Sequence, residues 1–387
     1  MMIPLTPKEK LLCCALADDP AWQAAELRRW WEETGEEPAW EFCGNNEARA
    51  IVAVALTAVL GAEAIPARWS AEAAGTEARL KLFMAQLDRV AEALEREGIR
   101  LIALKNSGIA RGIFPHLAAC PMGDIDVLVD PREFRQAHAC LLGLGYRLNS
   151  RSPLGEKNLE EAEQSGGSEY EYPLSDGSML WFELQWRPVA GRWIRQEKEP
   201  PAGELLARSV GIAGSAARLL APEDNLMQVC LHTAKHSYVR APGFRLHSDV
   251  DRIVRRCPLD WTRFVADAER LQVCTAVYFS LWLPAQLLRT PVPEWVLARL
   301  APAGWKTRVI TRSLLRAGLF NGEESKWSKP GYIGFNLLLY DSPAEAMQAV
   351  FPSYLTMRRR YNLTTRWTLP WWYAVRVAEL LLKRART

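Results

Sequence analysis

The sequence of 387 residues lacks the cysteine pattern of a secreted or zinc-binding protein. Its eight cysteines are scattered, and no two of them form a Cys-x-x-Cys pair. A disulfide framework or a structural zinc site needs paired or clustered cysteines. A segment with the features of a secretory signal is also missing from the first residues. We therefore expect reduced thiols and a cytoplasmic protein.

Two further absences restrict the partners. No apolar run reaches the length of a membrane span, so we expect no transmembrane segment. The net charge of +3 is too small to favour a nucleic-acid partner, because such proteins usually gather Lys and Arg on one face. The final segment "WWYAVRVAELLLKR" is aromatic and basic. It is either an interfacial membrane helix or a helix docked on the protein, and Glu379 in its middle favours docking.

Common phosphate-binding loops are missing from the first 95 residues, which contain neither GxGxxG nor GxxxxGK[ST]. Their apolar spacing is typical of helices, the last of which ends near Gly98. Period-2 segments that predict strands follow, and helical spacing returns beyond residue 200. The sequence predicts an α+β protein with three parts: a helical N-terminal lobe over 1–98, an α/β core over 99–200 and a helical C-terminal domain over 201–387.

The stretch "PMGDIDVLVDP" places two aspartates in a strand that is otherwise apolar. Side chains alternate along a strand, so Asp124 and Asp126 share one face while Ile125 and Val127 face a core. Two adjacent carboxylates repel each other and are costly to remove from water. A hard cation such as Mg²⁺ or Mn²⁺ between them resolves both problems. The pattern predicts a metal site, although solvated strand ends often produce the same spacing.

Two other segments strengthen that prediction. The stretch "MLWFELQW" pairs as a hairpin with "SEYEYPL" around "SDGS", and it places Trp181, Glu183 and Gln185 on one face. If this strand lies beside the aspartate strand, Glu183 completes a cluster of three carboxylates. Such clusters hold metal ions for in-line phosphoryl transfer. Between the strand "RLIALK" and the next helix lies the polar turn "KNSG", whose backbone amides are suited to phosphate oxygens.

These residues resemble the DNA polymerase β-type nucleotidyltransferase superfamily, which has a Gly-Ser turn, an Asp-x-Asp strand and a third acid on a later strand. More narrowly, the sequence resembles a bacterial family of uncharacterised nucleotidyltransferases that is often encoded near natural-product biosynthesis genes. The matching text is "ALKNSG", "CPMGDIDVLVDPREFRQAHACLLGLGYRL", "FELQW" and "PEDNLMQVCLHTAKHSY", in the family's order.

The resemblance implies a small mixed-sheet nucleotidyltransferase core flanked by the two helical lobes. It implies transfer of a nucleoside monophosphate from a nucleoside triphosphate to a small-molecule or peptide acceptor, with Mg²⁺ or Mn²⁺ and with release of pyrophosphate. The implied catalytic and metal-binding residues are Asp124, Asp126 and Glu183. The candidate nucleotide-binding residues are Lys105, Asn106, Ser107, Gly108, His232 and Lys235.

Three positions depart from the family pattern: Asn106 replaces glycine, Cys120 replaces arginine and Gln185 replaces histidine. Asn tolerates left-handed backbone best after glycine, so we expect the turn to keep its shape, with Ser107 donating to a phosphate oxygen and with weaker triphosphate binding. These departures leave a non-enzyme alternative open. In it, a weak or inactive nucleotidyltransferase fold serves as a binding or scaffold protein in a biosynthetic or toxin–antitoxin-like system.

A glycosyltransferase is a further alternative, because these enzymes also use Asp-x-Asp, but they usually place it after a long nucleotide-binding half that is missing here. His232 and His236 lie four residues apart on a predicted helix without a third ligand, so zinc is not expected. That helix face either lines the nucleotide cleft or has ordinary helix polarity. Asp249 and Asp251 repeat the Asp-x-Asp spacing within a helical pattern, where residues two apart do not face each other. We expect Asp249 to be structural and Asp251 to lie at the surface.

Overall fold

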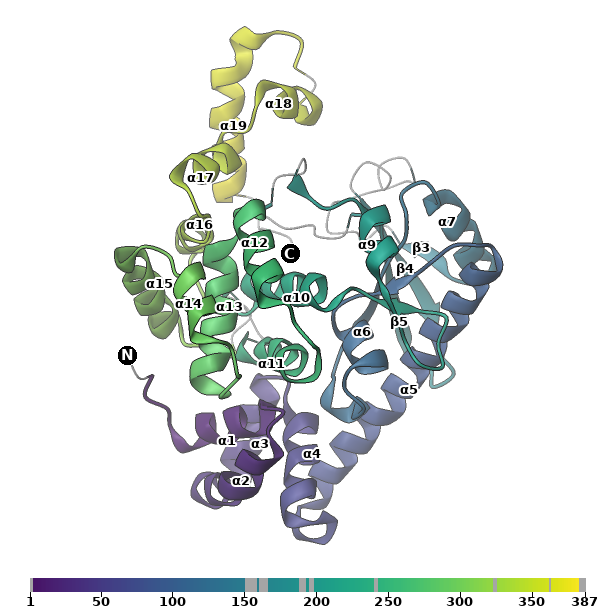
Figure 1. The fold of residues 1–387 in the computed structure, drawn as a ribbon, viewed down its shortest axis with the longest axis vertical. Helices are drawn as coiled ribbons and strands as arrows, with labels where there is room; N and C mark the ends of the chain where they lie inside the picture. The colour runs from purple at the N-terminus through teal and green to yellow at the C-terminus, as the bar shows by residue number, and fades with distance from the viewer. Residues whose placement is uncertain are drawn as a thin grey trace.

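The computed structural model describes residues 3–149, 159, 166–187, 193–194, 198–239, 243–322, 326–361 and 363–382 (Figure 1). One mixed sheet of seven strands forms from the middle of the chain, and helices precede and follow it. The α+β class with flanking helical regions is therefore confirmed. The proposed divisions after residues 98 and 200 stay predictions.

The N-terminal helices form a layer at the bottom of Figure 1. They are α1 (Pro7–Leu16), α2 (Pro20–Thr34), α3 (Glu36–Asn45), α4 (Arg49–Leu60), the short η1 (Ala62–Ala64) and α5 (Ala67–Arg96). The long α5 leaves this layer and runs along the sheet region, where it contacts α7 (Phe134–Gly143). Its apolar stripe, which includes Leu87, Val90 and Leu94, is buried, so this helix links the N-terminal layer to the core.

The sheet has the strand order β3–β4–β5–β2–β1–β7–β6. The strands are β1 (Ile102–Ala103), β2 (Asp124–Leu128), β3 (Arg147–Asn149), β4 (Gly167–Pro173), β5 (Met179–Gln185), β6 (Val210–Gly211) and β7 (Arg218–Leu219). β2 pairs in parallel with β5 and antiparallel with β1, and β4 and β5 form the expected hairpin. β2 is the central strand of this order, and its residues after Asp124 are all buried.

The two faces of the sheet are covered differently. Ile125, Val127 and Phe182 point into the main core, which they share with the apolar side chains of α5. On the opposite face, Leu128 belongs to a small separate core under α9 (Ala202–Arg208). Because side chains alternate, the acids of β2 and β5 lie on this second face, beside the end that α9 covers.

The remaining helices follow or interrupt the strands in the chain. They are α6 (Lys105–Gly112), η2 (Leu117–Ala119), α10 (Pro222–His236), η4 (Gly243–Leu246), α11 (His247–Arg256), α12 (Trp261–Leu271), α13 (Cys274–Leu287), α14 (Glu294–Leu300), α15 (Gly304–Ala317), α16 (Lys329–Leu338), α17 (Pro343–Val350), α18 (Tyr354–Tyr361), η5 (Arg366–Thr368) and α19 (Leu369–Leu382). The apolar α13 packs against α10 and α11, and α10 also contacts α6. The helical part is thus joined directly to the sheet through α6.

The C-terminal helix α19 packs on α16 and α18, as the docked alternative predicts, and α17–α19 extend away from the body in Figure 1. Trp371 nevertheless keeps 69% of its surface exposed. Among the described helices, none combines the length and the apolar character that a membrane crossing requires. All eight cysteines are free, in agreement with the expected reduced thiols.

Several local expectations were wrong. The strand β1 has only two residues, and α6 begins at Lys105, so the expected polar turn is the first turn of a helix. The residue with left-handed backbone is Lys105, with φ +50°, rather than Asn106. The sequence Asp130-Pro131 favours a helix start, but α7 begins only at Phe134, and Asp130 Oδ1 accepts hydrogen bonds from the Arg132 backbone N–H and Nε. The polar composition over 151–168, rich in glycine and serine, predicts a loop, and this segment lies largely outside the described residues.

Candidate active site

The parallel pairing of β2 and β5 brings three carboxylates together. Asp126 lies directly opposite Glu183 in the register, and Asp124 precedes Asp126 on the same face. One oxygen from each of the three carboxylates lies within 4.8 Å of the others. Asp126 is almost fully buried, Glu183 is half-buried and Asp124 is exposed to solvent. The sequence therefore predicted both the strand and the third acid that form this cluster.

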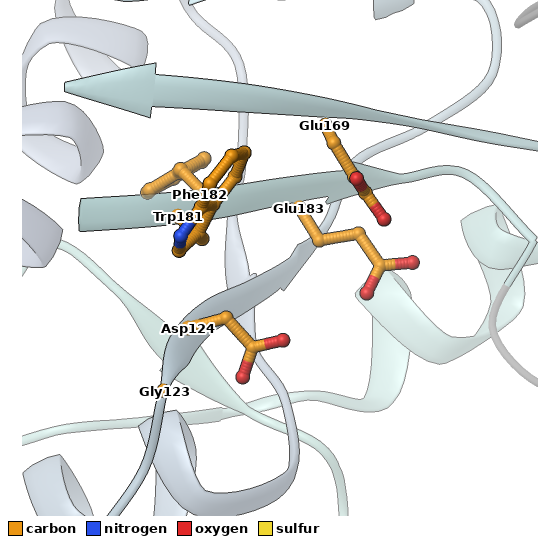
Figure 2. A pocket seen from close by; sticks show the side chains of 6 residues that line it. All are labelled: Gly123, Asp124, Glu169, Trp181, Phe182 and Glu183. Atoms are coloured by element: carbon orange, nitrogen blue, oxygen red, sulfur yellow. The ribbon is translucent and has the colours of Figure 1, made fainter. Parts of the chain in front are cut away.

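A pocket of about 420 Å³ opens at the cluster (Figure 2). It is lined by Gly123, Asp124, Glu169, Trp181, Phe182 and Glu183. Figure 2 shows the carboxylates of Asp124, Glu169 and Glu183 extending toward the same side, with the ring of Trp181 to their left in this view. The pocket combines a flat aromatic wall with an acidic end. The space beside Gly123 is open, since an added Cβ there would meet nothing within 4 Å.

Glu169 was missed by the sequence analysis. It lies on β4 directly opposite Glu183, so the two side chains share the pocket face. Burial raises the pKa of Glu169, and the nearby Asp126 carboxylate adds to this shift. The hairpin register could have predicted this residue. Pairing "SEYEYPL" with "MLWFELQW" around a short turn places these two glutamates opposite each other.

Lys105 and Gln185 donate hydrogen bonds to the innermost acid. Lys105 Nζ lies 2.6 Å from Asp126 Oδ1 and 3.8 Å from Glu183 Oε2. Gln185 Nε2 donates to the same Asp126 Oδ1 at 3.1 Å. The residue that replaces the family histidine is thus in direct contact with the carboxylate cluster.

The cluster carries more negative charge than Lys105 balances. The Asp126 carboxylate raises the pKa of Asp124, and the partial loss of hydration at the crowded cluster adds to this shift although the residue as a whole is exposed. Burial raises the pKa of Glu183, and Asp126 adds to it, while Lys105 opposes both shifts. Burial alone would lower the pKa of Lys105, but the surrounding acids raise it above its ordinary value. Lys105 is therefore an ammonium at neutral pH, and the remaining charge favours a further cation.

The other candidate residues of the α6 turn face the protein. Ser107 is fully buried, and its Oγ accepts a hydrogen bond from the Asp126 backbone N–H at 3.0 Å. An added Cβ on Gly108 would lie 2.6 Å from the Ala103 carbonyl oxygen, so this glycine permits the close approach of α6 to β1. The Asn106 amide lies between the Pro121 carbonyl and the Asp249 carboxylate. Of the three, Ser107 contacts β2 directly, and phosphate binding by any of them stays a prediction.

His232 and Lys235 lie on α10, which packs against α6, and both side chains are half-buried. The His232 ring contacts the His236 ring, with their centroids 4.7 Å apart. Among the described residues, the group suited to a metal contains neither histidine, and the residues that line the pocket include neither His232 nor Lys235. Their nucleotide-binding role stays a prediction.

Three arginines hold the segment that leads into β2. Arg252 on α11 donates to the Ala119 carbonyl at 2.7 Å, and Arg245 in η4 donates to the Pro121 carbonyl at 3.0 Å. The third, Arg79 on the N-terminal helix α5, donates to the Met122 carbonyl at 3.1 Å. Arg252 also lies against the Cys120 sulfur, at 3.5 Å. An arginine from another helix thus contacts the position where the family pattern has its own.

The carboxylate cluster fits a divalent cation of the Mg²⁺ or Mn²⁺ type. Its donors are hard oxygens on neighbouring strands. The Asp126 carboxylate raises the pKa of Asp124, and burial together with Asp126 raises the pKa of Glu183, so a cation would stabilise the ionised forms of both acids. The described residues offer no cysteine or histidine in this group, which argues against a softer metal.

Comparison with known proteins decides the family. The model of the uncharacterised nucleotidyltransferase family matches residues 49–289, more than half of the chain. The chain belongs to this family. The family match begins at α4 and ends just after α13, so it includes the whole sheet, the carboxylate cluster and α10. The helices α1–α3 and α14–α19 lie outside the match. No curated protein matches the chain.

Proposed function

We propose that the protein is a metal-dependent nucleotidyltransferase that transfers a nucleoside monophosphate from a nucleoside triphosphate to an acceptor and releases pyrophosphate. The observation that carries this proposal is the convergence of Asp124, Asp126 and Glu183 at an open pocket in a chain of this family. A divalent ion held by these carboxylates would neutralise the triphosphate and the charge that develops during transfer.

The residues of the chain have separate roles in this proposal. Asp124 and Asp126 hold the metal, and Glu183 completes the site and takes the proton of the acceptor hydroxyl. That hydroxyl oxygen forms a bond to the α-phosphorus while the bond to the pyrophosphate oxygen breaks. Trp181, beside the acids, offers a flat face for stacking a base or a ring-shaped acceptor. Lys105, whose ammonium contacts Asp126 and Glu183, is the candidate nucleotide-binding residue that would lie nearest the phosphates in this proposal.

A second candidate is a binding protein that has the same fold but does not transfer nucleotides. Its support is the pair of donors on Asp126, because Lys105 and Gln185 already occupy one oxygen of a central ligand. In this case the pocket would bind nucleotide without turnover, and the protein would act as a scaffold for a biosynthetic or toxin-like partner.

Incubation of the full chain with labelled nucleoside triphosphates, Mg²⁺ or Mn²⁺ and panels of hydroxyl-bearing small molecules and peptides tests the proposal. We expect metal-dependent pyrophosphate release and labelled acceptor, and we expect Asp126→Asn to abolish both. Glu171→Gln is the matched control. Glu171 lies on the same face of β4 as Glu169, but it accepts a hydrogen bond from Asn149 and lies opposite Trp181 rather than Glu183.

The outcomes separate the two candidates. Turnover that persists in Asp126→Asn at the wild-type rate would rule out the assigned cluster. Nucleotide binding without transfer, measured by calorimetry, would favour the scaffold candidate. Loss of activity in Glu171→Gln as well would show that the assay reports disruption of the sheet rather than loss of a metal ligand.

A further inference from the structure

The Lys105 ammonium lies within the carboxylate cluster. Its Nζ is 2.6 Å from Asp126 Oδ1 and 3.8 Å from Glu183 Oε2, so it lies near both of these acids. A second divalent ion in a three-carboxylate site would have to share the same two groups. The side chain is 22% exposed, which leaves little room for another occupant beside it.

The backbone fixes this position. Lys105 is the first residue of α6 and has φ +50°, a conformation that costs a non-glycine residue free energy. Two hydrogen bonds hold the segment against β2: Leu104 N–H donates to the Asp126 carbonyl at 2.9 Å, and Asp126 N–H donates to Ser107 Oγ at 3.0 Å. The strained residue therefore aims its side chain at the strand that carries the acids.

Gln185 adds a second donor to the same oxygen. Its Nε2 lies 3.1 Å from Asp126 Oδ1, which also accepts from Lys105. Gln185 reaches this oxygen from β5, on which it shares one face with Glu183. Asp124 and Glu183 line the pocket and remain as ligands there, whereas Asp126, whose side chain is 6% exposed, is not among the residues that line it.

We propose that Lys105 takes the place of one of two divalent ions, so that this chain binds a single divalent ion beside a fixed ammonium. One ammonium and one divalent ion together balance the three carboxylates. Lys105 is thus a positioning residue that holds Asp126 and Glu183, and the metal lies toward Asp124. This inference rests on the metal-dependent transfer proposed above, but metal binding can be measured without turnover.

Titration of the full-length chain with Mn²⁺ alone tests the proposal, with free Mn²⁺ followed by electron paramagnetic resonance and heat by calorimetry. We expect one Mn²⁺ per wild-type chain. Lys105→Met removes a positive charge a few ångströms from the ion while keeping the length of the side chain. It should tighten Mn²⁺ binding more than about tenfold or add a second bound ion.

Lys81→Met is the matched control, since Lys81 lies on α5 with 65% of its side chain exposed and forms a surface ion pair with Glu77. It should bind Mn²⁺ as the wild type does. Two Mn²⁺ ions in the wild type, no Mn²⁺ in the wild type, or unchanged affinity and stoichiometry in Lys105→Met would each overturn the proposal.

Lysine acetylation followed by mass spectrometry tests the wild type in case Lys105→Met does not fold. Lys105 should react far more slowly than Lys81 both without metal and with Mn²⁺, because the ammonium stays in the cluster. An Mn²⁺-induced rise of Lys105 toward the reactivity of Lys81 would show that the metal displaces it, and the proposal would fail. One bound Mn²⁺ without nucleotide transfer would refute the proposed function alone, whereas transfer with two bound ions would refute this inference alone.

Discussion

The chain contains two Asp-x-Asp sequences, one on a strand and one on a helix, and they have opposite surroundings. On β2, Asp124 and Asp126 face the same way and meet Glu183, with Lys105 as their nearby cation. On α11, Asp249 and Asp251 diverge, and each is buried. The strand thus concentrates negative charge, while the helix separates it.

Each helical aspartate has its own partners. Asp251 accepts from Arg255 Nε at 2.9 Å, from Thr290 Oγ1 at 2.6 Å and from the Asp18 N–H at 2.7 Å. Asp249 lies 3.3 Å from Arg252 Nη1 and contacts the Asn106 amide. The expected structural role of Asp249 agrees with these contacts, but the surface position expected for Asp251 was wrong. The backbone period decides whether two carboxylates form one site or two separate anchors.

The largest expected effect is a difference in the free energy of unfolding between a change in the α11 aspartates and the same change in the β2 aspartates. Asp251→Ala leaves Arg255, Thr290 and the Asp18 N–H without their buried acceptor, so it should lower the free energy of unfolding by about 3–5 kcal/mol. The same change at Asp124 relieves repulsion at an exposed position, and without metal it should alter stability by less than about 0.5 kcal/mol or increase it. Urea unfolding of both variants measures the difference. Equal losses would mean that Asp124 also has a structural role.

A divalent metal should stabilise the protein through the aspartates of β2 and not through those of α11. At a Mn²⁺ concentration one hundred times its dissociation constant, the free energy of unfolding of the wild type should rise by about 2.7 kcal/mol. Asp124→Asn should lose most of this increment, while Asp249→Asn should keep it, whatever its basal stability. Thermal unfolding with and without Mn²⁺ gives both values. An increment that survives in Asp124→Asn would place the metal elsewhere.

The metal increment should depend on pH. Asp126 with burial raises the pKa of Asp124 to about 7, and burial with Asp126 raises the pKa of Glu183 to about 8. The folded state therefore holds these protons more tightly than the unfolded state, so these two groups make the metal-free protein less stable as pH rises toward these values. Mn²⁺ requires the ionised forms, and its stabilisation should grow over the same range. Unfolding between about pH 5 and pH 9 measures both trends, which an Asp124→Asn/Glu183→Gln variant should flatten.

The smallest expected effect concerns the support of the strand pair. Ser107→Ala leaves the buried Asp126 N–H without its acceptor and should cost about 1–2 kcal/mol of stability. Ser70→Ala, at an exposed position on α5, is the control and should change stability very little. Chemical unfolding of the two variants gives the comparison. A negligible loss in Ser107→Ala would leave its hydroxyl free for the phosphate contact that the sequence predicts.

The sequence predicted the parts of the site that follow from alternation along a strand. Asp124, Asp126 and Glu183 share faces because strands have a period of two, and the turn "SDGS" fixed the hairpin. It did not predict that Lys105 enters the cluster, because this depends on a left-handed residue after a strand of only two residues. Asp251 was misplaced for a related reason, since its partner Asp18 lies 233 residues away in the chain.

The three arginines that hold Ala119, Pro121 and Met122 have a mechanical consequence. Arg79 belongs to the N-terminal helix α5, whereas Arg245 and Arg252 belong to the C-terminal helical part. The segment before Asp124 therefore connects α5 to the C-terminal helical part. The first residues of β2 cannot unfold locally without breaking hydrogen bonds to both of these parts. The β2 amide protons should exchange with solvent only when the protein opens globally. Any hinge motion of α5 relative to α11 would pull on Gly123 and reshape the mouth of the pocket.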